Sequence, residues 1–328
     1  MGELKLLDAV RAALQEEMRR DRRVILMGGD VRTSSSGLSA GLVEEFGEKR
    51  LVDMPIAEAA MAGMATGAAM VGLRPVLDLG NLGFSLTGMD QITNEGPKIH
   101  YKFNGQLSVP VVYLFQYAAR GWGAQHDQAI YALLGHMPGL KIVLPSTPRD
   151  AKGLVKAAIR DDNPVAVCIA LDLMASTGPV PDTDECVDIG TANILRSGAD
   201  LSIFASGAMV SRALEAAGIM AIRGVSVEVV DVRSLVPLDW DTLTRSVRKT
   251  GRAIVLDQGH FTCGFAPTIA AGIQERAFDA LKGPVLSVAA LDVPVPYNLT
   301  LADEIVPTTT RLVVSIEQAL QAGAALRV

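Results

Sequence analysis

The apolar positions at the start of the chain follow a helical rhythm. Leu6, Val10, Leu14 and Met18 recur four residues apart, which is the spacing of one buried helix face. After a basic turn, the continuous apolar run 24–27 ends in a Gly-Gly-Asp turn. The pattern predicts a helix followed by a buried strand.

The same alternation continues through the first half of the chain. Further short apolar runs are separated by stretches long enough for helices; they are 51–54, 75–79, 109–115, 141–144 and 164–170. Buried strands that alternate with helices are typical of a mainly parallel sheet covered on both faces. The first half is therefore predicted to be an α/β domain.

Composition changes between residues 174 and 188, where Ser, Thr, Gly, Pro and acidic residues replace the apolar periodicity. We place a linker at 176–190, between a first domain over 1–175 and a second over 191–328. In the second, strands are predicted at 201–205, 226–231, 253–256 and 285–288, and helices at 209–222, 240–247 and 265–280. The fold class is thus α/β, with two doubly wound domains.

The composition favours a small-molecule enzyme. Of 328 residues, 49% are hydrophobic and 5% aromatic, so much apolar surface must be buried in a core or against other subunits. A net charge of -6 without a Lys/Arg cluster argues against nucleic acid. The most apolar uncharged run, 59–73, stops at Arg74 after 15 residues, short of the ~20 that cross a bilayer. We therefore expect neither a nucleic-acid nor a membrane partner.

The cysteines and the N-terminus favour a cytoplasmic protein. Cys168, Cys186 and Cys263 are widely spaced and odd in number, which gives no disulfide framework. The first residues include Glu3 and Asp8 and lack the basic start of a secretory signal. No Gly-Lys dipeptide, G-x-G-x-x-G or H-E-x-x-H motif occurs, so phosphate-loop, nicotinamide and zinc chemistry lose support.

Glu58 is the first candidate functional residue. It follows a predicted strand at the start of a helix and is followed by Ala-Ala-Met-Ala-Gly, without a counter-ion within one helical turn. A solvated carboxylate favoured by the helix dipole is the simpler interpretation. The small apolar neighbours predict burial instead, and a buried carboxylate is more often functional.

His126 is the second candidate, in the Gly-rich stretch 120–128 after a predicted strand. Glycines allow close approach of a ligand, and ligands bind at strand ends in α/β sheets. A surface histidine paired with Asp127 is an equally good interpretation. Phe84, between Gly83 and Ser85, could stack on a flat ring, although a phenylalanine is more often simply core.

These residues belong to stretches that resemble a known family: the beta subunit of the thiamine-diphosphate-dependent first component of 2-oxo acid dehydrogenase complexes. The resemblance covers nearly the whole chain in the right order. It rests on residues 53–59 (DMPIAEA), 72–76 (GLRPV), 90–94, 124–126 (AQH), 138–141 (PGLK), 145–148, 150–154, 158–164 (AIRDDNP), 231–235 (DVRSL), 237–239 and 292–297 (DVPVPY).

The resemblance implies a pyrimidine-binding domain followed by a transketolase C-terminal-like domain. It implies an α2β2 assembly that decarboxylates a 2-oxo acid with thiamine diphosphate and passes the acyl group to lipoamide on an acyltransferase component. Glu58 would bond a ring nitrogen of the aminopyrimidine, and the Ile56 carbonyl would accept from its amino group. Phe84 would cover the ring, and His126 would guide protons or hold the substrate and lipoyl group.

Metal ions are implied less directly. Backbone carbonyls match a potassium site known in some family members: those of Val111, Ala158, Ile159, Asp161 and Asn163. The diphosphate and its magnesium need a Gly-Asp-Gly turn, and the Gly29-Asp30-Val31 stretch lacks the second Gly. An alpha subunit is therefore expected to hold the magnesium and the diphosphate.

Several residues depart from the family pattern. Gly80 and Gly83 make the pocket wall beside Phe84 less polar, and Gly96 with Pro97 is expected to interrupt a helix. These departures leave pyruvate, branched-chain 2-oxo acids and acetoin open as substrates. Half of a split transketolase and a non-catalytic assembly subunit are the alternatives. The apolar helix expected from residue 58 to 71 is predicted to lie at a subunit interface.

Overall fold

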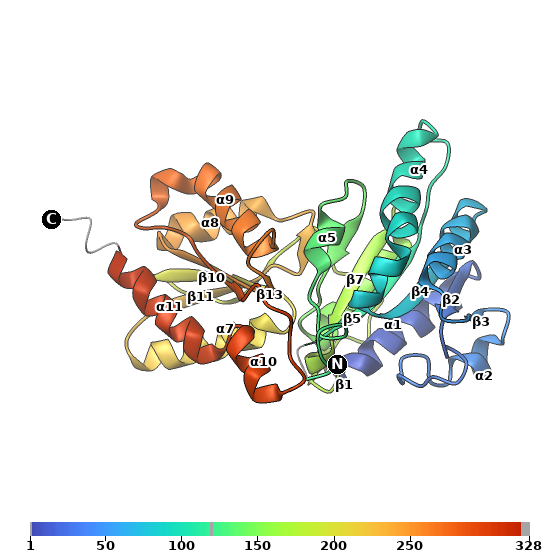
Figure 1. Cartoon of the computed structure of the whole chain (residues 1–328), viewed down its shortest axis with the longest axis horizontal. Helices are drawn as coiled ribbons and strands as arrows, with labels where there is room; N and C mark the ends of the chain where they lie inside the picture. Colours follow the sequence, from blue (N-terminus) through green and yellow to red (C-terminus); the bar gives the residue numbers. More distant parts are fainter. Residues whose placement is uncertain (1, 119–120, 323–328) are drawn as a thin grey trace. The chain divides into compact units, whose positions relative to one another are not determined.

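Alternating apolar runs produce two α/β units in the computed structural model, which describes residues 2–118 and 121–322 (Figure 1). Over the described residues, one unit contains the chain up to 117 together with 133–189. The other contains 118–132 together with the chain from 190 onward. The prediction of two α/β domains is confirmed, and the segment around His126 belongs to the second unit.

The first unit is built on a parallel sheet in which β6, β7, β5, β4, β2 and β3 are neighbours in that order. The bounds are β2 Val24–Gly28, β3 Leu51–Asp53, β4 Arg74–Asn81, β5 Val112–Tyr117, β6 Lys141–Val143 and β7 Val165–Ala170. Strands β2 and β7 are buried along their whole length, which explains their uninterrupted apolar sequences.

Six α-helices accompany this sheet: α1 Leu6–Arg20, α2 Leu42–Phe46, α3 Glu58–Met70, α4 Gly96–Lys102, α5 Tyr131–Gly135 and α6 Pro148–Arg160. Shorter segments are the 3-10 turns η1 Leu82–Gly88 and η3 Leu171–Leu173 and the π-helical η2 Gln91–Glu95. Helices α1 and α6 pack on each other, and α3 packs on β4. The predicted linker contains strand β8 Thr177–Val180, which pairs antiparallel with β1 Gly2–Lys5.

Pro97 does not interrupt the helix as the sequence suggested. The π-helical η2 leads directly into α4, so Pro97 stands in the first turn of that helix. Proline is tolerated there because the first backbone N–H groups of a helix have no partner within it. Glycine at position 96 is explained by close packing, because a Cβ there would lie 2.7 Å from the Tyr113 hydroxyl.

The second unit has a five-stranded sheet in the order β14, β13, β10, β11, β9, parallel except for β9. Figure 1 shows α8 and α9 on one face of this sheet and α7 and α11 on the other, as expected for a doubly wound domain. The bounds are β9 Asn193–Arg196, β10 Leu201–Ala205, β11 Val227–Asp231, β12 Ser234–Val236, β13 Ala253–His260, β14 Leu286–Ala290, α7 Met209–Ile222, α8 Trp240–Thr250, α9 Phe265–Ala277, η4 Phe278–Ala280, α10 Leu299–Ile305 and α11 Thr309–Ala322.

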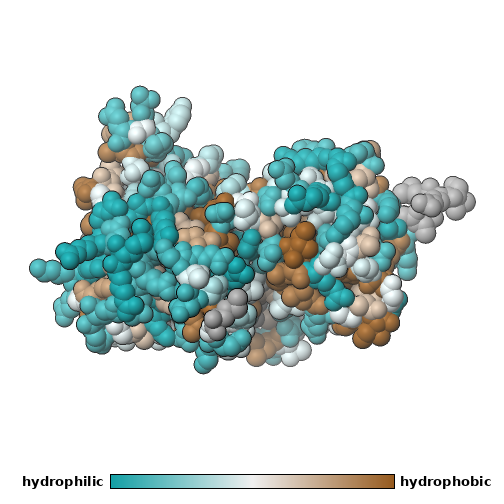
Figure 2. Space-filling view, turned by 180° about the vertical axis from the view of Figure 1, so that it is seen from behind, coloured by the Kyte–Doolittle hydropathy of each residue, from teal (hydrophilic) through white to brown (hydrophobic). Residues whose placement is uncertain are grey.

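Apolar side chains also remain on the surface. Figure 2 shows them as brown patches separated by hydrophilic residues on one face of the molecule. Met64 and Val71, on and just after α3, are 56% and 82% exposed. Among the described residues, each helix is too short or too polar to span a bilayer.

Candidate active site

A cavity of about 530 Å³ in the first unit is lined by residues that follow β2, β3 and β4. Strands β2, β3 and β4 are parallel neighbours, so their carboxyl ends meet at one edge of the sheet, where α/β proteins bind ligands. The lining is Gly29, Asp30, Ser35, Ser36, Met54, Pro55, Ile56, Glu58, Met61, Asp78, Leu79, Gly80, Phe84 and Gln116. Three of the predicted site residues, Ile56, Glu58 and Phe84, therefore share this cavity.

Glu58 begins helix α3, whose preceding residue Ala57 offers no side-chain cap. Its Oε2 accepts a hydrogen bond from Thr87 Oγ1 at 2.9 Å, and no ion pair of the described residues includes it. The expected burial is corrected: Glu58 is half-buried, because Ala57, Ala59 and Ala60 around it are exposed at the helix start.

Ile56 and Phe84 present complementary groups to the same space. Ile56 is 85% exposed. The N–H of Met61 bonds to the Ala57 carbonyl at 2.9 Å, whereas no hydrogen bond within the described residues ends on the carbonyl of Ile56. Phe84 lies on η1 and is 36% exposed to solvent. The cavity thus combines a carbonyl acceptor, a carboxylate and an aromatic face, which suits a flat heterocycle with amino and ring-nitrogen groups.

Asp78 and Asp30 were missed from the sequence. Asp78, near the end of β4, accepts a hydrogen bond from the Gly80 N–H at 2.9 Å. Burial raises the pKa of Asp78 to about 6, although that hydrogen bond acts in the opposite direction. Asp30 occupies the turn after β2 with a positive φ of 56°. The signals in the sequence were an acidic residue just after the apolar run 24–27 and another inside the apolar run 75–79.

His126 lies in the second unit, in a loop that two glycines shape. Gly121 and Gly123 have positive φ, and a Cβ on Gly123 would lie 2.5 Å from the Tyr297 ring. His126 is half-buried. The alternative of a pair with Asp127 does not hold, because Asp127 is buried and its Oδ2 accepts from the Trp122 N–H at 2.6 Å.

A second cavity of about 550 Å³ adjoins this loop within the second unit. His260 lines it and its Nδ1 lies 2.7 Å from the Leu291 carbonyl. Asp292 accepts from the Thr262 N–H at 3.0 Å and from its hydroxyl at 2.6 Å. The remaining lining residues are Ala124, Asp127, Gln128, Val293, Pro294 and Val295.

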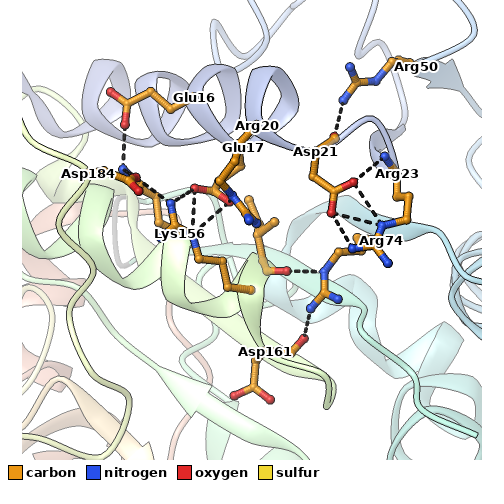
Figure 3. Close-up of polar contacts among 12 residues, drawn as sticks. Glu16, Glu17, Arg20, Asp21, Arg23, Arg50, Arg74, Lys156, Asp161 and Asp184 are labelled. Atoms are coloured by element: carbon orange, nitrogen blue, oxygen red, sulfur yellow. Dashed lines mark hydrogen bonds and ion pairs between the residues drawn. The ribbon is translucent and has the colours of Figure 1, made fainter.

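The residues of the predicted potassium site lie around the carboxyl end of α6 and the starts of β5 and β7. Arg74 Nε donates to the Ile159 carbonyl at 2.7 Å and Arg74 Nη2 to the Asp161 carbonyl at 2.6 Å (Figure 3). The Val111 carbonyl accepts from the Val165 N–H at 3.0 Å. The described residues contain no group of three metal-binding side chains.

A G-x-S-x-G sequence at 37–41 resembles the spacing around a nucleophilic serine. Ser39, however, is only 3% exposed and precedes the five-residue helix α2, without a strand directly before it. It therefore lacks the exposed strand-to-helix turn that such a nucleophile needs.

Comparison with known families matches the chain in two consecutive parts. Residues 3–174 match the family described as "Transketolase, pyrimidine binding domain", and residues 190–312 match "Transketolase, C-terminal domain". The chain belongs to this transketolase-like family. The resemblance seen in the sequence is thereby confirmed, and the cavity around Glu58 lies in the pyrimidine-binding domain of a family member.

Relatives that span nearly the same length carry two kinds of name. The chain is 39% identical to the Bacillus subtilis "Acetoin:2,6-dichlorophenolindophenol oxidoreductase subunit beta", over 94% of this chain and 95% of that protein. It is 41% identical to the Caenorhabditis elegans "Pyruvate dehydrogenase E1 component subunit beta, mitochondrial", over 95% of this chain and 91% of that protein. Both relatives are named as beta subunits.

Solved structures support the fold assignment. A "Split gene transketolase, inactive beta4 tetramer" superimposes with a TM-score of 0.80 at 24% identity, covering 98% of this chain and all of that one. A transketolase from Leishmania mexicana superimposes with a TM-score of 0.73 at 16% identity, covering all of this chain and 47% of that one. At these identities the likeness concerns the fold alone.

Proposed function

We propose that this chain is the beta subunit of a thiamine-diphosphate-dependent 2-oxo acid dehydrogenase, which decarboxylates a 2-oxo acid and transfers the acyl group to lipoamide. Pyruvate is the favoured substrate. The observation that carries the proposal is the single cavity shared by Glu58, Phe84 and Ile56. Relatives named as pyruvate dehydrogenase beta subunits support it.

The cavity fits the aminopyrimidine half of the cofactor. Phe84 offers an aromatic face, the Ile56 carbonyl an acceptor for the amino group, and Glu58 a carboxylate for a ring nitrogen. When bound, thiamine diphosphate supplies a thiazolium ring that accepts electrons as carbon dioxide leaves. We assign the magnesium and the diphosphate to an alpha subunit.

The residues of this chain hold and move protons. Glu58 would share a proton with the ring nitrogen. General acid–base catalysis of this kind typically raises the rate by about 10²–10⁴-fold. The Ile56 carbonyl fixes the orientation of the amino group, and Phe84 fixes the plane of the ring. His126 is proposed to guide proton movement or to hold the substrate and the lipoyl group.

The proposed partners are an alpha subunit in an α2β2 assembly and a lipoyl-bearing acyltransferase. The alpha subunit is supported by relatives that are named "subunit beta". It is also supported by the exposed apolar side chains of Met64 and Val71 in this chain. A reducing, cytoplasmic location is consistent with three free cysteines. We propose that potassium, where it binds, is held by the backbone carbonyls of Val111, Ala158, Ile159, Asp161 and Asn163. The carbonyls of Val111, Ile159 and Asp161 accept hydrogen bonds within the chain, and each keeps a second lone pair for a cation.

The test is decarboxylation by this chain co-purified with its alpha partner, with thiamine diphosphate, magnesium and an artificial electron acceptor. The panel contains pyruvate, branched-chain 2-oxo acids and acetoin. We expect activity that requires both chains and falls at least about 100-fold in Glu58→Ala. The matched control is Glu44→Ala, which removes an exposed carboxylate from α2.

A second candidate function is oxidative cleavage of acetoin, which relatives at 39% identity favour. Acetoin as the best substrate in the panel would select it. Ketol transfer between sugars, without activity on the panel, would select the split-transketolase alternative. A stable heteromer that binds the cofactor and catalyses none of these reactions would indicate a non-catalytic assembly subunit.

A further inference from the structure

The side chain that contacts Glu58 comes from a turn 29 residues further along the chain. Asn81 initiates that turn, η1, by accepting a hydrogen bond from the Gly83 N–H at 2.9 Å. A 3-10 helix has three residues per turn, so Phe84 and Thr87 lie on the same side of η1. The side of η1 that carries the proposed ring-covering phenylalanine therefore also carries Thr87.

Close packing fixes η1 against the start of α3. A Cβ on Gly88 would lie 3.0 Å from the Glu58 carbonyl oxygen and 3.5 Å from the Ala59 nitrogen. The two backbones are thus nearly in contact beside the carboxylate, and the neighbouring Thr87 hydroxyl lies 2.9 Å from Glu58 Oε2. This distance is that of an ordinary hydrogen bond.

Thr87 is the one side-chain donor to Glu58 among the described residues. Its hydroxyl also lies 2.9 Å from the Phe84 carbonyl, one turn back. A hydroxyl has a single proton, so the carboxylate and this carbonyl compete for it. Within the part of the chain that the structure describes, no cation pairs with the Glu58 side chain, and a glutamate side chain has three rotatable bonds. Without Thr87, its orientation would be set by the ligand alone.

We propose that Thr87 is a positioning residue for Glu58: its hydroxyl engages Oε2 and so leaves Oε1 to face the ring nitrogen of the cofactor. This inference rests on the proposed function. The proton that Glu58 shares must lie between the ring nitrogen and the carboxylate oxygen that faces it. Because the Thr87 hydroxyl binds Oε2, the oxygen that faces the nitrogen is Oε1. A fixed reacting group also costs less ordering during the reaction.

The experiment compares Thr87→Val, which removes the hydroxyl but keeps the shape, with Thr87→Ser, which keeps the hydroxyl. Both are measured in the complex of alpha and beta chains at saturating thiamine diphosphate. For Thr87→Val we expect kcat to fall about 10-fold, the loss of one hydrogen bond to a charged group, with KM for the 2-oxo acid changed less than about twofold. Thr87→Ser, which keeps the hydroxyl, should keep the wild-type kcat and KM.

Thr268→Val is the matched control, because it removes an exposed threonine hydroxyl that bonds only to the Gly264 carbonyl of its own helix. A wild-type kcat in Thr87→Val would overturn the inference, as would a Thr87→Ser enzyme as slow as Thr87→Val. Glu58→Gln separates the two levels. If it is inactive while Thr87→Val is normal, only the role of Thr87 is wrong; if it is fully active, the proposed function of Glu58 is wrong.

Discussion

Helices α3 and α6 have the same length and belong to the same unit, yet they are stabilised in different ways. Each has 13 residues and contacts the central sheet, α3 at β4 and α6 at β7. The Thr147 side chain caps α6 by accepting a hydrogen bond from the Asp150 N–H, whereas α3 has no side-chain cap. Ten residues of α6 are buried and only five of α3. Helix α6 is therefore the better-packed of the two within this chain.

Charges account for much of the difference. Lys152, Lys156 and Arg160 recur four residues apart along α6 and form ion pairs with Glu16, Glu17 and Asp184. Figure 3 shows Lys156 between Glu16 and Asp184. Hydrogen bonds from Arg160 and Lys156 lower the pKa of Asp184 to about 2. These pairs hold α6 to α1 and to the segment before the second unit.

Helix α3 has no comparable set of partners. After Glu58 it carries no charged residue, and its apolar surface continues onto its exposed side. Small residues keep this surface flat, while Met64 and Val71 protrude from it. The comparison shows that α6 finds its partners within its own chain, while α3 carries the proposed functional carboxylate of Glu58 and leaves apolar side chains exposed, as expected of an interface.

The largest effect is expected where the α6 pairs are buried. Glu17 is fully buried and accepts hydrogen bonds from Arg160 Nη2 at 2.6 Å and Arg20 Nε at 2.7 Å. Glu17→Ala removes the ion-pair partner of Arg20 and leaves Arg160 with Asp184 alone. Because hydrogen bonds to a charged group contribute about 1.5–3 kcal/mol each, the free energy of unfolding should fall by about 3 kcal/mol. Denaturant unfolding at matched protein concentration measures it, with exposed Glu44→Ala as the control. A loss below about 1 kcal/mol would contradict the picture of a tightly paired α6.

The next effect concerns β4, the strand on which α3 packs, where Asp78 is half-buried and forms no ion pair within the described residues. The pKa of Asp78 is about 6 in the folded chain, compared with an ordinary value of 3.8. Between these values the folded state binds more protons, so the contribution of Asp78 to stability falls as pH rises, and its penalty is complete above pH 6. The shift corresponds to at most about 3 kcal/mol.

Asp78→Asn should therefore stabilise the chain at pH 8 and leave its stability unchanged near pH 4. Asparagine keeps an oxygen that can accept from the Gly80 N–H. Thermal unfolding across this pH range measures the gap between variant and wild type, and Asp182→Asn, at an exposed carboxylate, should produce none. A gap that does not grow with pH would mean that Asp78 is not buried in its charged form.

Local pattern predicted the elements well and the site only in part. Strand β10 and helix α7 have the predicted bounds, because each is a clean apolar segment with turn residues at its ends. Thr87 was not predicted, since a single hydroxyl carries no pattern and its partner is far away in sequence. Nor could local pattern show that Gly123 packs against Tyr297, which ties the His126 loop to the second unit.

The smallest effect on folding, and the sharpest test of the comparison, is expected at Met64. Its side chain is 56% exposed on α3, so Met64→Glu should change the free energy of unfolding by less than about 0.5 kcal/mol. If the apolar surface of α3 is an interface, the same change buries an unpaired carboxylate on assembly and should weaken binding to the alpha chain by a factor of at least about 100. Sedimentation of the mixed chains measures this. Ile222→Glu is the matched control, because Ile222 is 90% exposed at the end of α7. Equal binding by wild type and Met64→Glu, or a wild-type chain that remains a monodisperse monomer with its partner at micromolar concentration, would mean that α3 exposes apolar surface without using it.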